Sequence, residues 1–192
     1  MMDNKVKDYL PGQYVGKESE TTESVIADDE AAAIALFHAA VERLQDINNW
    51  HKLCGFLSTA FTLADYSGDP LSGKPSIGNF IRINIPGPGT KTGRGYDWVR
   101  IEKIRHIVLD PHQELFFIQV RPAPYPLSRE NEVAHFFRDS ATSSFMLVRE
   151  LRQVTAAVYG RNEVPNTALS DIVDRIRNEV IANTGAIGLS IM

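Results

Sequence analysis

Alternation between apolar and polar residues in the middle of the chain is the feature that most restricts its fold. In the stretch NFIRINIP, residues 79–86, Ile81, Ile83 and Ile85 occupy every second position, as on one face of a β-strand. Comparable runs cover residues 56–65, 96–110, 114–122 and 143–159, and turn residues such as YSGDP and DPHQ separate several of them. Successive strands joined by short turns predict an antiparallel sheet. The run at 96–110 is long enough to need a bulge near Lys103.

Helical periodicity precedes and follows these strands. Residues 28–47 begin with Asp28 or Asp29 as a candidate N-cap, and residues 167–184 are followed by a glycine, which is common after a helix. A short helix capped by Ser128 is expected over residues 128–137, after the proline-rich connector PAPYPLS. The apolar stripes consist of Ile34, Phe37, Val41 and Leu44 in the first helix and of Leu169, Ile172, Val173, Ile176 and Val180 in the last.

The N-terminal residues lack any such period. The stretch GKESETTES is polar and acidic, which predicts a flexible arm over residues 1–27. Residues 28–192 are then expected to form a single domain, since the chain is long enough for one substantial core. The expected fold class is α+β: a curved antiparallel sheet of about five to six strands, packed against a long C-terminal helix, with an N-terminal helix.

Charge and composition exclude several classes of protein. The net charge is −4, so no general attraction to nucleic acid or to an anionic membrane is expected. No apolar run approaches the ~20 residues of a membrane-spanning helix. Cys54 is the single cysteine, which rules out an internal disulfide and suits a reducing compartment. The expectation is a cytoplasmic protein.

Two glycine-rich stretches need to be weighed as phosphate sites. GDPLSGKP, residues 68–75, has the G-x-x-x-x-G-K spacing, but Pro75 stands where that motif requires a hydroxyl, and a strand rather than a helix follows. It is therefore interpreted as a surface hairpin. In GPGTKTGRG, residues 87–95, no helix follows either. Lys91 and Arg94 leave two interpretations open, a long turn or a mobile rim over a binding cavity.

The sequence assigns no catalytic residue, metal ligand or cofactor. The histidines lack the spacing of a zinc motif, and there is one cysteine to assist them. His51 and Cys54 can meet on one helical turn, but a buried thiol is the commoner arrangement. If the protein is an enzyme, Asp97 and Glu102 are the acids closest to the candidate binding residues.

One face of the predicted sheet has an unusual composition. It mixes bulky aromatic residues with arginines, where a solvent-exposed face is rich in lysine, glutamate, serine and threonine. Aromatic residues and arginine are enriched in protein interfaces, and a few polar groups among apolar ones are typical of ligand pockets. Three interpretations stay open: an ordinary outer face, a ligand pocket or a subunit contact. The candidate ligand-binding residues are Phe80, Arg82, Tyr96, Trp98, Arg100, Phe117 and Arg121.

The order of elements resembles a known family. An early helix that leads into LQDINNWHKLCG, then antiparallel strands, then a long amphipathic helix, is similar to the helix-grip fold of the START/Bet v 1-like (SRPBCC, polyketide-cyclase-like) superfamily. The resemblance covers residues 29–184, and it departs from the family in lacking a clear strand before the first helix. It implies a curved sheet that grips the last helix around a cavity for hydrophobic small molecules, without universal catalytic residues.

The expected function is therefore binding of a small, largely apolar ligand in a cavity between the sheet and the C-terminal helix, with no catalysis. The alternative is a structural or assembly subunit, homo-oligomeric or part of a larger complex. Such a subunit would use the face of Phe80, Trp98, Arg100 and Arg121 as a protein–protein interface.

Overall fold

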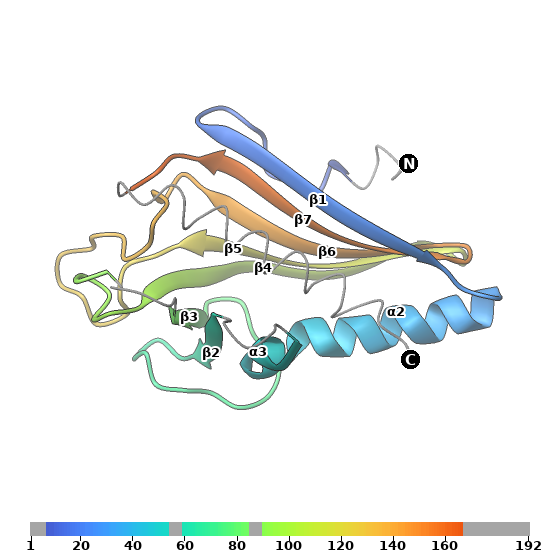
Figure 1. Cartoon of the computed structure of the whole chain (residues 1–192), viewed down its shortest axis with the longest axis horizontal. Helices are drawn as coiled ribbons and strands as arrows, with labels where there is room; N and C mark the ends of the chain where they lie inside the picture. The colour runs from blue at the N-terminus through green and yellow to red at the C-terminus, as the bar shows by residue number, and fades with distance from the viewer. Residues whose placement is uncertain (1–6, 54–58, 85–89, 167–192) are drawn as a thin grey trace.

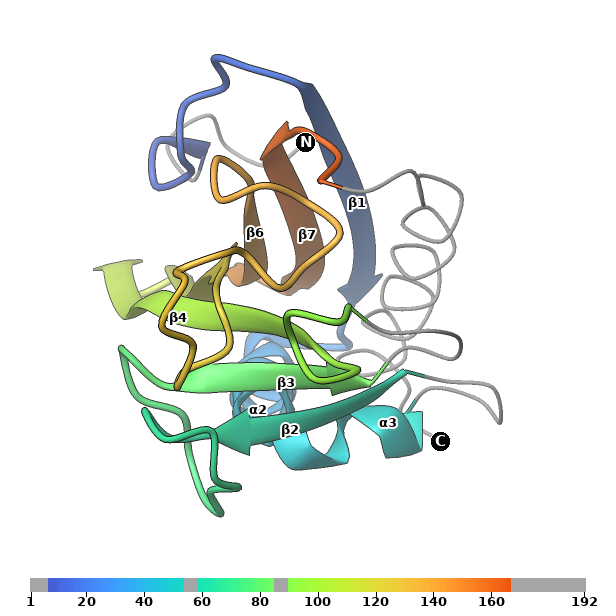
Figure 2. The ribbon, with the colours of Figure 1, turned by 90° about the vertical axis from the view of Figure 1, so that its left-hand side faces the viewer.

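A computed structural model describes residues 7–53, 59–84 and 90–166. Within these ranges, seven antiparallel strands form one curved sheet in the order β1-β7-β6-β5-β4-β3-β2 (Figures 1 and 2). The strands are β1 (Lys17–Ile26), β2 (Ala60–Ala64), β3 (Phe80–Asn84), β4 (Asp97–Asp110), β5 (Gln113–Pro122), β6 (Thr142–Glu150) and β7 (Gln153–Glu163). The α+β class is confirmed, and the sheet is larger than the sequence predicted.

The first strand corrects the prediction of a flexible arm for residues 17–26. Strand β1 forms a long antiparallel ladder with β7, in which Ser24 lies opposite Thr155 and Val25 lies opposite Val154. Its polar sequence suits an edge strand, because polar and charged residues there discourage further strand pairing. The structure therefore has a strand before the first helix, which the sequence alone did not predict clearly.

Helix α2 (Glu30–Gln45) begins as predicted, with the Asp29 carboxylate accepting a hydrogen bond from the Ala32 N–H at 2.7 Å. The helix lies along one face of the sheet, which we call the inner face (Figure 1), and contacts β6 and β7. Phe37, Val41 and Leu44 are buried as predicted, whereas Ile34 is exposed. Ala33, Leu36 and Ala40 complete the buried stripe, so the stripe is rotated from the predicted position.

A short 3-10 helix, η1 (Ile47–Asn49), and helix α3 (Trp50–Leu53) connect α2 to the edge strand β2. The Asn48 side chain fixes this connection, because its oxygen accepts from the Leu63 N–H at 2.8 Å and its nitrogen donates to the Leu71 carbonyl at 2.7 Å. Trp50 packs against Phe61 and Phe145, with both ring-centroid distances at 5.2 Å. Its indole thereby joins the inner faces of β2 and β6.

Strands β3, β4 and β5 follow the predicted alternation. The bulge in β4 lies between Ile101 and Lys103, as expected from the length of that run. Ile81 and Ile83 are buried on the inner face as predicted, and Ile85 lies outside the described residues. The full inner-face set on these strands is Ile81, Ile83, Val99, Ile101, Phe116, Ile118 and Val120.

Two further predictions are wrong. Residues 128–137 form an irregular loop with isolated bridges instead of a helix, including one between Pro124 and Val133. The run at 143–159 is a hairpin of β6 and β7 rather than one long strand, and Leu151 takes a positive φ of 53° in its turn. The predicted C-terminal helix at 167–184 lies outside the described residues. No helix in the described part of the chain is long and apolar enough to cross a membrane.

Candidate functional site

The inner face of the sheet is an apolar wall that continues beyond α2 toward the start of β4. Ile83, Val99 and Val120 belong to the main core cluster together with residues of α2. Asp97 pairs with Ile83 across the β3–β4 ladder, and directly opposed residues share a face of the sheet. Asp97 is therefore a carboxylate on an otherwise apolar surface, and only 5% of it is exposed.

The environment of Asp97 favours its protonated form. Burial raises the pKa of Asp97 to about 7, and a hydrogen bond with the Thr90 side chain offsets only part of that effect. The Oδ1 atom of Asp97 is buried, and within residues 7–53, 59–84 and 90–166 it has no hydrogen-bond partner. Leaving a buried polar oxygen unpaired is costly, and each such group calls for an explanation. The sequence places Asp97 near the candidate binding residues but contains no local signal of its burial.

A second polar cluster lies at the opposite end of α2. The Arg149 Nε donates to Glu114 at 2.7 Å, and the His106 Nε2 lies 3.0 Å from the same carboxylate. Glu30 at the start of α2 approaches Arg149 at 3.4 Å and His112 at 2.6 Å. These contacts join the helix start to the β4–β5 and β6–β7 turns, which gives the cluster a structural role.

Burial alone would raise the pKa of Glu114, but hydrogen bonds from Arg149 and His106 and the charge of Arg149 outweigh it. The pKa of Glu114 is therefore lowered, and this carboxylate stays ionised at neutral pH.

The predicted candidate residues lie on the opposite, outer face, and they divide into separate groups. Phe80, Arg100 and Arg121 line one pocket. The Arg82 guanidinium instead lies over the Tyr96 ring at 4.7 Å. Phe117 belongs to another apolar cluster, which contains Leu115, Met146 and Tyr159 and is covered by Tyr9 and Leu10 of the N-terminal segment.

Trp98 lies beneath the pocket and does not line it. The side chain is 2% exposed, and its Nε1 donates to the Gly93 carbonyl at 3.1 Å. Phe80 and Tyr125 pack edge-on against the indole, with centroid distances of 6.4 and 5.4 Å. Because the indole is already covered within the chain, the interface hypothesis loses its largest proposed anchor.

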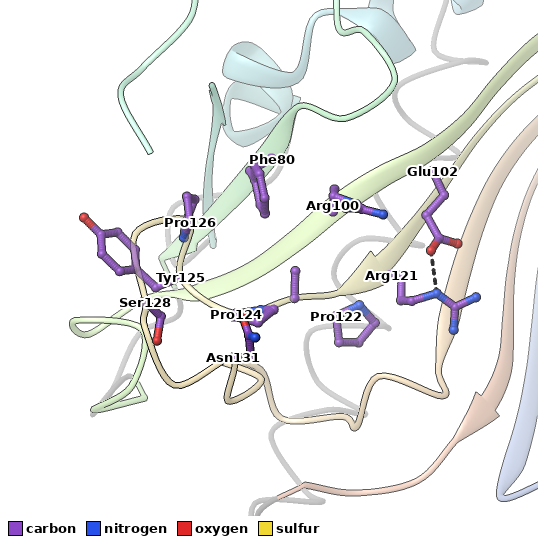
Figure 3. Close-up of a pocket in the computed structure, with 11 residues that line it drawn as sticks. Phe80, Arg100, Glu102, Arg121, Pro122, Pro124, Tyr125, Pro126, Ser128 and Asn131 are labelled. Atoms are coloured by element: carbon purple, nitrogen blue, oxygen red, sulfur yellow. Dashed lines mark hydrogen bonds and ion pairs between the residues drawn. The ribbon is translucent and has the colours of Figure 1, made fainter. Parts of the chain in front are cut away.

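The pocket itself has a volume of about 270 Å³ and lies between the outer face of β3–β5 and the loop after β5 (Figure 3). Sequence reasoning missed the loop side of this pocket. The sequence feature that could have indicated it is the proline-rich stretch PAPYP, which was interpreted only as a connector. The lining residues are Phe80, Arg100, Glu102, Arg121, Pro122, Ala123, Pro124, Tyr125, Pro126, Ser128 and Asn131.

The two glycine-rich stretches take different roles. In the described part of the second one, Gly93 supplies the carbonyl that holds Trp98, and Gly95 has a φ of +87°. That part of the stretch is a turn which supports the outer face, and residues 85–89 lie outside the described ranges. The stretch at 68–75 is a loop before β3, as predicted, and Lys74 pairs with Glu42 at 2.7 Å. Over the described ranges, no group of three or more histidine, cysteine, aspartate or glutamate side chains is arranged to hold a metal ion.

No protein-family model matches the sequence, and no curated protein matches it. Solved structures with a related arrangement of elements include the Zhui aromatase/cyclase from Streptomyces sp. R1128, with a TM-score of 0.46 and 11% identity over 89% of this chain and 90% of that one. They also include Ara h 8.0201, with a TM-score of 0.42 and 9% identity over 90% and 96% of the two chains. A protein from Nitrosospira multiformis has a TM-score of 0.42 and 10% identity over 90% and 97%.

Proposed function

We propose that the protein binds a small, largely apolar ligand against the inner face of the sheet, with Asp97 forming the one directional polar contact. The observation that carries the proposal is the Asp97 Oδ1 atom, which is buried on the face that Asp97 shares with Ile83 and has no hydrogen-bond partner among the described residues. An apolar surface with a small number of well-placed polar groups is the usual composition of a ligand site.

The chemistry of Asp97 narrows the ligand class. With a pKa of about 7, this carboxyl is divided between its protonated and ionised forms at neutral pH. It can therefore donate a hydrogen bond to a carbonyl of the ligand or accept one from a hydroxyl. The second wall of the cavity, the helix expected over residues 167–184, remains a prediction.

Nuclear magnetic resonance can test this proposal through the indole N–H of Trp50, which lies on the inner face against Phe61 and Phe145. We expect members of a panel of fatty acids, sterols and aromatic alcohols or ketones to shift the Trp50 signal. At pH 8, where the Asp97 carboxyl is mostly ionised, Asp97→Asn should weaken binding of a hydroxyl-bearing compound by about tenfold, because a charged acceptor is replaced by a neutral one.

Asp69→Asn is the matched control, because Asp69 is an exposed carboxylate on the loop after β2. It should leave binding unchanged. A panel in which no compound moves the Trp50 signal would refute the proposal. Equal affinity in the Asp97→Asn and wild-type proteins would remove the role given to Asp97.

A further inference from the structure

Two cations and one anion line the pocket on the outer face. Arg121 is occupied, because its Nε donates to Glu102 at 2.6 Å and its Nη1 donates to the Asp139 carbonyl at 2.6 Å. Arg100 is exposed and has no hydrogen-bond or ion-pair partner among the described residues. Together, Arg100, Arg121 and Glu102 leave the pocket with one unbalanced positive charge.

Apolar side chains surround this charge. Phe80 lies beside Arg100, and Tyr125 with its flanking prolines forms the facing wall (Figure 3). Ser128 and Asn131 add a hydroxyl and an amide on the loop side of the pocket, away from Glu102 and Arg121. The lining thus combines flat apolar surfaces, the Arg100 guanidinium, the Arg121–Glu102 pair and two neutral polar groups, which suits a ligand with an apolar body and an anionic end.

The pocket is held in shape before any ligand binds. The loop is attached to the start of β4 by backbone hydrogen bonds, from the Ala123 N–H to the Trp98 carbonyl at 2.9 Å and from the Trp98 N–H to the Ala134 carbonyl at 2.8 Å. Tyr125 is fixed between the Trp98 indole and the Arg94 guanidinium, which lies 4.6 Å from the Tyr125 ring centroid. A preorganised wall reduces the entropy that binding would otherwise cost.

From these features we infer that the outer-face pocket is a second binding site, for a small organic anion with a planar apolar body, such as an aromatic carboxylate. The Arg100 guanidinium binds the carboxylate, and Phe80 and Tyr125 contact the ring. The volume of about 270 Å³ lies just below the usual range of ~300–1,000 Å³ for drug-sized ligands, which limits the ligand to about one ring. This site is on the opposite side of the sheet from the one proposed above and does not depend on it.

The test uses benzoate as the probe and the full chain labelled with ¹⁵N. Trp50 and Trp98 are the two tryptophans, so the two indole signals report separately on the inner face and on the base of the outer pocket. We expect benzoate to shift the Trp98 signal and leave the Trp50 signal in place. Benzamide, which has the same shape without the charge, and inorganic phosphate, which lacks the ring, should each bind about tenfold or more weakly.

Two variants distinguish the effect of the Arg100 charge on binding from the effect of the net charge of the protein. Arg100→Gln should weaken benzoate binding by about tenfold or more, as expected for a lost charged hydrogen bond. Arg105→Gln removes the same charge from the same strand, opposite Phe117 and outside the pocket, and should have little effect. Phe80→Leu should weaken benzoate and benzamide alike.

Three results would overturn the inference. One is the absence of any shift of the Trp98 signal up to about 10 mM benzoate, a concentration at which a ligand with a millimolar dissociation constant would be detected. Another is equal loss of affinity in Arg100→Gln and Arg105→Gln, which would mean that net charge alone attracts the probe. The third is a shift confined to Trp50, which would place benzoate on the inner face and support the proposed function in place of this second site.

Discussion

The guanidinium of Arg149 and the carboxylate of Glu114 form an ion pair at 2.7 Å, with side-chain exposures of only 4% and 7%. The pair lies between strands β5 and β6, under the start of α2, and Glu30 and His106 extend it. The remaining donors of Arg149 reach the backbone carbonyls of Pro111 and His112. Because nearly every donor has a partner, this buried charge is tolerated in the core of the sheet.

Removing one member of this pair should therefore be severe. Arg149→Met leaves the Glu114 carboxylate buried without its main partner, and we expect the free energy of unfolding to fall by about 3–5 kcal/mol in urea denaturation. The double variant Arg149→Met/Glu114→Leu should be more stable than Arg149→Met alone. The exposed pair Lys74–Glu42 is the control, since Lys74→Met should cost no more than about 1 kcal/mol. Similar losses at both sites would contradict the buried-pair interpretation.

Asp97 should make stability depend on pH in a defined direction. Its pKa is raised from 3.8 to about 7 in the folded protein, so the folded state binds the proton more tightly than the unfolded state. Its contribution is then fully present below about pH 4 and is lost as the pH rises to about 7. Asp97→Asn removes this loss, and at pH 8 it should raise the free energy of unfolding by about 2–4 kcal/mol relative to the wild-type protein.

The measurement is thermal or urea unfolding of both proteins at pH 4 and pH 8. The difference between Asp97→Asn and wild type should be small at pH 4 and large at pH 8. Asp69→Asn, on the surface, should show no such divergence. A constant difference at the two pH values would mean that folding does not raise the pKa of Asp97.

Gly16 lies where the N-terminal segment packs against the end of strand β7. Its φ is +65°, and a Cβ added there would lie 2.5 Å from the Glu163 carbonyl oxygen. Gly16→Ala should therefore cost about 1–3 kcal/mol, from backbone strain and displacement of β1. Gly12→Ala is the control, because a Cβ at that position meets nothing within 4 Å. Hydrogen exchange of the β1 amides should accelerate in Gly16→Ala and remain unchanged in Gly12→Ala.

Trp98 should behave as a core residue of the outer face. Replacing it with alanine removes the surface against which Phe80 and Tyr125 pack, and we expect a loss of about 3–5 kcal/mol. Tyr66→Ala removes a ring that is 79% exposed and should change stability by less than about 0.5 kcal/mol. A Trp98→Ala protein as stable as the wild type would show that the loop after β5 is not packed on this indole.

Period-two alternation in the central strands was enough to predict their faces correctly. Ile81, Ile83, Val99 and Ile101 lie on the inner face because a strand cannot shift by one residue without exposing its whole apolar set. The bulge beside Lys103 was likewise predictable, since the run was too long for regular pairing. These predictions depend on local periodicity, which a single sequence records directly.

Strand β1 and the loop after β5 were missed for a different reason. The composition of GKESETTES is typical of a flexible segment, and its pairing with β7 is decided by a partner far away in the chain. The loop at 128–137 has acceptable helix signals, but backbone hydrogen bonds of Ala123 and Ala134 to the start of β4 stabilise an irregular conformation instead. Burial of Asp97 also depends on distant residues, so its raised pKa has no local signal.

The ladder between β1 and β7 also determines when the sheet can be completed. The Ser24 and Thr155 hydroxyl oxygens lie 2.8 Å apart although the two residues are separated by 131 positions. Strands with such a high contact order pair slowly, because the entropy of closing a long loop is lost before the contacts form. During synthesis the residues of β1 leave the ribosome before those of β7, and one edge of β7 stays unpaired until β1 docks on it. An open edge can accept a strand from another molecule, so concentration during refolding decides between intramolecular completion and strand exchange.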